Sequence, residues 1–293
     1  MNSNVMKKTM YLFVLPALIF YLLFWIIPIL KIFQYSISDY NGFVQKFNYV
    51  GLSNYKSLIH EGILGLSISN TLIYTAVSVI FGNIIALCLA FILNANIRGK
   101  GFYRSAAYIP TLFSAIVVGF IWSYVYMPDE GLIATFLKLI GIKGVEINFL
   151  GSYGSALYAI IGVDIWKNIG TSTIIFLAGL QTVPHDLIEA GKIDGCSSWK
   201  LTRFIRLPLL ATSITINVTL SVINGLKAFD YPFIMTNGGP GTSTNTLIYA
   251  VYKMGFVDQL FGKASALSVI SFGMIVVISI FFVLKLNKRE VSV

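Results

Sequence analysis

Long apolar runs separated by short polar segments dominate the hydrophobic pattern of the chain. Each run supplies about 20 residues, enough for a helix to cross roughly 30 Å of hydrocarbon. A helix also satisfies its own backbone hydrogen bonds in lipid, where no water is available to do so. The pattern therefore predicts an all-α integral membrane protein whose six transmembrane helices lie at about residues 9–30, 70–93, 105–126, 155–180, 209–228 and 266–286.

Composition favours the same class of protein. Hydrophobic residues make up 56% of the 293 residues and charged residues only 11%, against about 45–50% and about 25% in ordinary soluble domains. No repeat or low-complexity linker divides the chain, so we expect a single transmembrane domain over residues 1–293. The first apolar run begins like a signal peptide, but it is long enough to span and no small-residue cleavage site follows it.

The net charge of +9 raises nucleic acid as a partner, but the basic residues are scattered in short segments between apolar runs. This distribution fits membrane topology and lipid head groups better than a nucleic-acid surface. With six spans both termini lie on one side, and the segments on that side carry more Lys and Arg than the longer segments opposite. The excess predicts that both termini and the polar loop at residues 182–208 are cytoplasmic.

Two short helices are predicted within the polar loop at residues 182–208. Pro184 suits a helix start because its missing N–H would have no partner there. Gly195 can adopt the left-handed conformation that ends a helix, and Ser197 or Ser198 can cap a second helix at Trp199–Leu207. The loop is therefore either a docking element for another protein or a solvated amphipathic hairpin without a partner.

The string EAGKIDG in this loop, followed at a fixed distance by IRLP, resembles the EAA motif of ABC importer permeases. The matching positions are Glu189, Ala190, Asp194, Gly195, Ile205, Leu207 and Pro208. Gly191 and Cys196 replace alanines but remain small. Ala190 and Gly191 put almost no side chain on the surface between Glu189 and Asp194, so that another backbone could approach there. Thr202 replaces a frequent Phe, whose packing role Trp199 or Phe204 could take.

This resemblance implies the fold of an ABC type I importer permease. It also implies that Glu189, Ala190, Gly191, Asp194 and Gly195 couple the chain to an ATPase subunit, by fitting into a groove on that subunit. The motif thus gives the polar loop an expected partner on the cytoplasmic side, where the distribution of Lys and Arg independently places it.

A second resemblance lies in residues 229–256, FDYPFIMTNGGPGTSTNTLIYAVYKMGF, which are similar to the signature of the maltose-type "F" permease subunit of carbohydrate importers. VGLSNY at residues 50–55 likewise resembles a segment of sugar-importer permeases. The Asn-Gly-Gly-Pro-Gly cluster predicts a re-entrant or surface loop. It lacks the Lys-Ser or Lys-Thr pair of a phosphate-binding loop, so we expect no ATP site in this chain.

Polar residues inside the predicted spans are costly in lipid, so each requires a partner, a cavity or a substrate. Asp164 and Lys167 lie three residues apart on one helical face and could pair with each other. Amides bind sugar hydroxyls and aromatic rings cover the apolar face of a sugar. The candidate substrate pathway consists of Tyr74, Asn83, Asp164, Lys167, Asn168, Asn217 and Asn224. Each of them could instead hold helices together.

Taken together, the resemblance implies a transmembrane subunit of an ATP-driven, binding-protein-dependent carbohydrate importer in a bacterial or archaeal cytoplasmic membrane. The implied partners are a second, homologous permease, two cytoplasmic ATPase subunits that bind ATP and Mg²⁺, and an extracytoplasmic solute-binding protein. The chain itself would be no enzyme and would hold no metal or cofactor. The alternative is an ion-gradient-driven secondary transporter or channel, for which a relay of carboxylates or matched broken helices would be expected.

Overall fold

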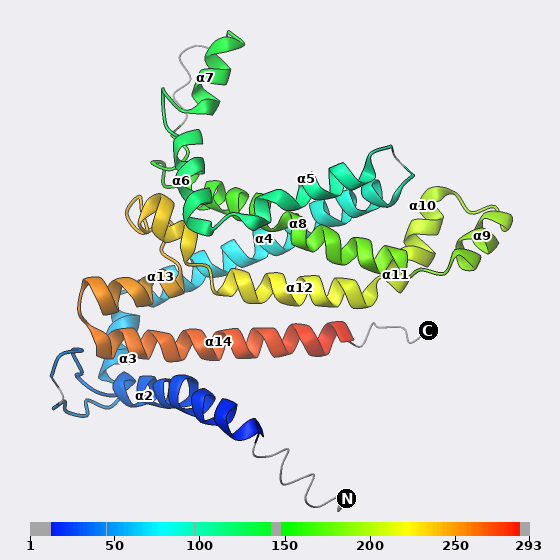
Figure 1. Cartoon of the computed structure of the whole chain (residues 1–293). Helices are drawn as coiled ribbons and strands as arrows, with labels where there is room; N and C mark the ends of the chain where they lie inside the picture. Colours follow the sequence, from blue (N-terminus) through cyan, green and yellow to red (C-terminus); the bar gives the residue numbers. More distant parts are fainter. Residues whose placement is uncertain (1–12, 45, 97, 142–147, 288–293) are drawn as a thin grey trace, which may run out of the picture. The chain divides into compact units, whose positions relative to one another are not determined.

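A computed structural model describes residues 13–44, 46–96, 98–141 and 148–287 of the chain (Figure 1). The described secondary structure is helical apart from one isolated bridge between Ser38 and Tyr49, which confirms the all-α prediction for this part. Contacts group the chain into two compact units. The first lies within Met1–Leu64 and Ala250–Phe272, and the second lies within Gly65–Tyr249 and Gly273–Val293.

Four described helices are long and apolar enough to cross a membrane. They are Phe13–Ser36, which contains η1 (Leu22–Ile26) and α2 (Ile27–Ser36), then α4 (Ile63–Asn94), α8 (Ala156–Gln181) and most of α14 (Phe261–Asn287). Two further candidates are bent helix pairs, so the count is four, or up to six if each pair is one span. All six candidates lie at the places where the sequence predicts spans.

The span predicted at residues 105–126 is not one straight helix. It consists of α5 (Lys100–Leu112) and α6 (Ala115–Val125), which meet at 97°. Phe113 between them is extended, and the Ser114 hydroxyl accepts a hydrogen bond from the Val117 N–H at 3.3 Å, which caps a new helix. The apolar composition of both pieces concealed this break from the hydrophobic pattern.

The span predicted at residues 209–228 begins at a second bend. Its main part is α12 (Ala211–Leu226), which lies at 69° to the helical segment Ser198–Leu209 before it. Pro208 stands at the start of the short helix α11 (Leu207–Leu209), and the chain changes direction at Leu210. The bend lies at the junction between the polar loop and α12.

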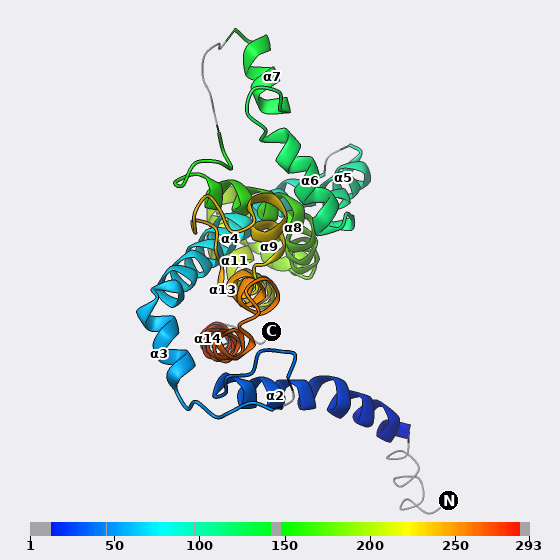
Figure 2. The ribbon, with the colours of Figure 1, turned by 90° about the vertical axis from the view of Figure 1, so that its left-hand side faces the viewer.

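The second unit is built around α8, which packs against α5, α6 and α12. Figure 1 shows α4, α5, α8 and α12 gathered into one bundle, and Figure 2 shows α4, α5 and α8 of this bundle from another side. Small residues allow this close packing: a Cβ added to Gly170 of α8 would collide with the backbone of α5 at Ala107 and Tyr108. Similarly, a Cβ on Gly225 of α12 would lie 2.8 Å from Cα of Thr75 in α4.

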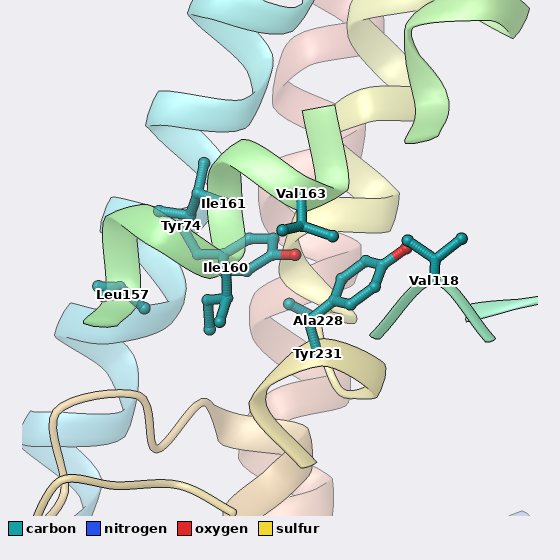
Figure 3. Packing of buried hydrophobic residues seen from close by; sticks show 8 residues of the cluster. All are labelled: Tyr74, Val118, Leu157, Ile160, Ile161, Val163, Ala228 and Tyr231. Carbon is teal, nitrogen blue, oxygen red and sulfur yellow. The ribbon is translucent and has the colours of Figure 1, made fainter. Parts of the chain in front are cut away.

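A buried cluster joins α4, α6, α8 and the segment that follows α12. In Figure 3 the ring of Tyr74, from α4, reaches toward Val163 of α8, and the ring of Tyr231 is directed toward Val118 of α6. Ile160 of α8 belongs to the same cluster and is fully buried. These contacts fix the helices that carry most of the polar residues selected from the sequence.

The remaining helices are short and lie in the segments between the long ones. They are α3 (Ser53–His60), α7 (Leu132–Leu139), α9 (His185–Ile193), α10 (Ser198–Leu201), η2 (Thr202–Arg206), η3 (Pro232–Thr236), α13 (Leu247–Tyr252) and η4 (Lys253–Val257). The VGLSNY string enters α3, where the Asn54 amide donates to the carbonyls of Ser36 at 2.9 Å and Ser38 at 2.8 Å. The VGLSNY string is thus held to the end of α2.

The Asn-Gly-Gly-Pro-Gly segment, predicted as a re-entrant or surface loop, leads into a buried stretch of the second unit. Residues 243–247 are buried, and the Thr246 hydroxyl donates to the Ala228 carbonyl at 2.7 Å. The Asn70 amide of α4 donates to the carbonyl of Thr242 at 2.9 Å. These bonds tie the loop into the bundle, so its turn residues shape a packed segment.

Candidate functional site

The polar loop folds as the two helices that the sequence predicts. Helix α9 begins at His185, directly after Pro184, and ends at Ile193, with Asp194 as its C-cap before Gly195, whose φ is +77°. The Ser197 hydroxyl then caps the next helix by accepting from the Lys200 N–H at 3.4 Å. We call the segment from α9 through α11, residues 185–209, the polar hairpin.

Packing inside the polar hairpin differs from the prediction. Trp199 and Phe204, expected to replace the missing aromatic at Thr202, are each 71% exposed. Leu201 is instead buried, and Ile205 lies half-buried beside it. Aliphatic side chains on the other side of the helix take over the packing, so the aromatic residues remain at the surface.

Gly191 has a role other than the one expected from the sequence. It is buried, and an added Cβ would lie 2.7 Å from Leu201 and 2.8 Å from Ile205. The small residue therefore lets α9 approach the second helix of the hairpin, and it does not open a surface for another protein. The prediction that Gly191 clears space for a partner's backbone is wrong for this reason.

Four other residues of the motif lie at exposed positions of the hairpin. Glu189, Ala190, Asp194 and Gly195 are all exposed, and we call them the hairpin face. In Figure 1 the hairpin lies beyond the ends of α8 and α12, the two helices that it connects. A force applied to the hairpin face would reach both helices through the backbone.

Between α4, α8 and α12 lies an open cavity of about 250 Å³. Its polar lining comes from hydroxyl, amide and carboxylate side chains, namely Ser78, Asp164, Asn168, Thr171, Ser172, Asn217, Ser221 and Asn224. Four of the predicted pathway residues therefore meet in this cavity: Asp164 and Asn168 of α8, and Asn217 and Asn224 of α12. Such groups can bond hydroxyls of a ligand from several directions.

A second open cavity, of about 310 Å³, adjoins the first and shares Asp164, Asn168 and Asn224 with it. Its further lining includes two lysines, one aspartate and two tyrosines: Lys167, Lys227, Asp230, Tyr74 and Tyr231. Positive and negative groups are equally represented in this second cavity. We call the two together the polar cavities.

Asp164 does not form the ion pair with Lys167 that the sequence suggests. Its carboxylate accepts a hydrogen bond from the Asn168 amide at 2.8 Å and interacts with the Tyr74 hydroxyl. No ion pair joins Asp164 to Lys167 in the described part of the chain. An amide one turn along the helix meets the carboxylate more directly than a lysine three residues away, whose long side chain turns to the cavity.

Two of the selected asparagines hold helices together. The Asn83 amide donates within α4 to the Val79 carbonyl at 2.8 Å and across to the Ser221 hydroxyl at 3.2 Å. The buried Asn217 amide donates to the Ser172 carbonyl of α8 at 3.0 Å. Asn224, in contrast, is exposed and lines both polar cavities.

Sequence reasoning missed several lining residues, namely Ser172, Ser221, Lys227, Asp230 and Tyr231. Asp230 and Tyr231 belong to the FDYP string, so the resemblance contained a signal for them. Ser221 precedes Asn224 by three residues and shares its helical face, which periodicity can reveal. Ser172 carries no comparable signal, because its position depends on how α8 meets α12.

The sequence of the chain is similar to those of known transport proteins. The model of the family described as "Binding-protein-dependent transport system inner membrane component" matches residues 78–292. The chain is 34% identical over 277 residues to the multiple sugar-binding transport system permease protein MsmF of Streptococcus mutans, covering 94% of each protein. It is 33% identical over 278 residues to the trehalose/maltose transport system permease protein MalF of Thermococcus litoralis, covering 94% of this chain and 92% of that one.

A solved structure shows the same fold. It is described as a bacterial ABC transporter involved in the import of the acidic polysaccharide alginate, and one of its chains superposes with a TM-score of 0.85 at 22% identity. The superposition covers 96% of both chains. The bent helices and the polar hairpin therefore belong to a fold found in ABC importers.

Proposed function

Because the chain belongs to the family of binding-protein-dependent transport system inner membrane components, we propose that it is the transmembrane subunit of an ATP-driven carbohydrate importer. The chain is thus a multi-pass permease subunit. The alternative, transport driven by an ion gradient, predicts a relay of carboxylates or matched broken helices. Among the described residues the polar cavities are lined by two carboxylates, Asp164 and Asp230, and two bent helix pairs are present, but the family match favours ATP-driven transport.

One observation carries the proposed mechanism: the polar hairpin is the direct connection between α8 and α12, and both helices line the first polar cavity. An ATPase subunit that grips the hairpin face would move these helices when it closes on ATP. The cavity would then open toward the outside, and hydrolysis of ATP would return it to the state that is open toward the cytoplasm. The close packing of Gly191 against Leu201 and Ile205 would help the hairpin to move as one unit.

Carbohydrate as the substrate class is supported by the sugar-transport relatives and by the chemistry of the cavities. Amides and hydroxyls at Asn168, Asn224 and Ser221 suit a ligand rich in hydroxyl groups. The lysines at positions 167 and 227 are balanced by Asp164 and Asp230. This balance favours a neutral sugar over a sugar acid or a glycerol phosphate.

The arrangement in the membrane belongs to the same proposal. We infer six spans, with each bent pair counted once, and both termini in the cytoplasm of a bacterium or archaeon. A second permease would complete the pathway, two ATPase subunits would bind ATP and Mg²⁺, and an extracytoplasmic binding protein would deliver the sugar. The greater number of Lys and Arg residues on the side of the polar hairpin supports this orientation.

Uptake of labelled sugars into proteoliposomes containing the whole complex tests this function. We expect uptake only with the binding protein present, and loss of uptake when the ATP-binding lysine of the partner ATPase is replaced. Dissipating ion gradients with ionophores should leave uptake unchanged. Uptake that survives loss of the ATP site but stops with the ionophores would instead establish the gradient-driven alternative.

A further inference from the structure

A third cavity, of about 430 Å³, lies at the base of the polar hairpin. Four cationic side chains from three elements line it: Lys100 and Arg104 of α5, Lys192 of α9 and Arg206 of η2. We call this cavity the basic pocket. It is separate from the polar cavities, with which it shares no lining residue, and from the exposed hairpin face.

Among the described residues, no acidic side chain pairs with the cations of the basic pocket. None of its lining residues is acidic, and none of the four cations forms an ion pair among the described residues. Arg104 donates from one terminal nitrogen to the Leu93 carbonyl at 3.2 Å, while its buried Nε has no acceptor in the described structure. Like charges gathered around one cavity repel one another, so an anion bound there would stabilise the fold.

The position of the pocket indicates what kind of anion it receives. Asn94 at the end of α4, and Leu180 and Gln181 at the end of α8, line it, and both helices are candidate spans. The ends of spans lie at the level of the lipid head groups. Leu180, Val183 and Ile188 add apolar walls beside the cations, as a lipid with a charged head and an apolar body requires.

We infer that the basic pocket binds the phosphate of an anionic phospholipid head group. Arg and Lys are suited to this ligand, because guanidinium and ammonium groups form strong, charge-assisted hydrogen bonds to phosphate oxygens. Basic pockets between helices on the cytoplasmic side of a membrane commonly receive such head groups. The cytoplasmic location of the basic pocket rests on the proposed function, whereas the pocket itself is observed in the structure.

The bound lipid would act on the polar hairpin. Lys192 lies on α9 and Arg206 lies on η2, whereas Lys100 and Arg104 belong to a helix of the bundle. One phosphate between them therefore fastens both helices of the hairpin to α5. The anionic lipid content of the membrane would then set how firmly the hairpin is held against the bundle.

The test uses the whole complex in nanodiscs of phosphatidylcholine, with or without phosphatidylglycerol. The pocket variant is Lys100→Gln with Lys192→Gln, and the matched control is Lys200→Gln with Arg203→Gln, which removes equal charge from exposed positions of the same hairpin. Native mass spectrometry measures retained phosphatidylglycerol, and thermal unfolding measures its effect on Tm. A conservative variant, Lys100→Arg with Lys192→Arg, keeps the positive charges and so distinguishes the effect of lost charge from the effect of a disturbed fold.

We expect phosphatidylglycerol to raise the Tm of the wild type, the control and the conservative variant, and to remain tightly bound to each. The pocket variant should lose most of this shift and the tightly bound lipid. Equal responses of the pocket variant and the control would overturn the inference, and so would stabilisation by added inorganic phosphate without any by phosphatidylglycerol. Loss of ATPase subunits from the pocket variant with unchanged lipid binding would assign the pocket to a protein interface instead. Both readouts measure binding, so they remain informative if sugar uptake is never observed.

Discussion

The polar hairpin and the polar cavities contrast in how their functional groups come together. In the hairpin, Glu189, Ala190, Asp194 and Gly195 are close in sequence, and all four are exposed in α9 and at its C-terminal end, where local rules of helix capping apply. In the cavities, Asn168 and Asn224 meet only because α8 and α12 pack together. A local motif thus specifies the hairpin face, whereas the cavities depend on contacts between distant segments.

The strongest way to break this contrast is to separate the helices of the bundle. Gly170→Leu should prevent close packing of α8 on α5, because even a Cβ at this position collides with the backbone of α5. We expect severe loss of assembled complex, since overpacking of this kind costs about 1–3 kcal/mol or more and backbone cannot yield as a side chain can. Size-exclusion chromatography of the purified complex measures it.

Gly101→Ala is the matched control for that variant, because Gly101 is exposed on α5 with no neighbour near its added Cβ. This control should assemble normally and gain slightly in helix stability. Equal assembly of Gly170→Leu and Gly101→Ala would show that the packing of α5 on α8 is not as close as described.

The internal packing of the hairpin offers the next largest effect. Leu201→Ala should destabilise the hairpin by about 2–5 kcal/mol, as truncation of a buried leucine usually does. Phe204→Ala, at a position that is 71% exposed, should change stability by no more than about 0.5 kcal/mol. Hydrogen exchange of α9 in the intact complex compares the two. Faster exchange in Phe204→Ala than in Leu201→Ala would contradict this packing and support the aromatic packing expected from the sequence.

A smaller, functional effect distinguishes two asparagines. Asn224→Ala, which removes an amide exposed to both cavities, should raise the KM for sugar uptake about 10-fold, as expected for about 1.4 kcal/mol from a lost hydrogen bond. Asn83→Ala should lower thermal stability instead, because its amide joins α4 to Ser221 of α12. Uptake kinetics and melting curves of both variants show which of them changes the KM and which changes the thermal stability. The reverse pattern would place the substrate contact at Asn83.

Much of the fold could be predicted from the sequence because lipid imposes simple requirements on length and hydrophobicity. The bends at Phe113 and Leu210 could not be, since apolar residues on both sides give a continuous run. The cap at Ser197 and the left-handed Gly195 follow from local chemistry and were predicted.

The candidate site divides in the same way. The motif gave the hairpin face, but the buried contact of Gly191 with Leu201 requires the tertiary packing of the hairpin. Likewise, Asp164 accepts from Asn168 and not from Lys167, because side-chain direction decides among neighbours that spacing alone treats as equivalent.

The most direct test of the central claim measures ATP hydrolysis by the reconstituted complex with and without sugar-loaded binding protein. Glu189→Lys and Gly195→Arg alter the hairpin face, and Lys200→Gln serves as a control elsewhere on the hairpin. We predict that both face variants lose stimulation by the loaded binding protein while the control retains it. Normal stimulation and uptake in both face variants would contradict the claim that the polar hairpin couples this permease to its ATPase.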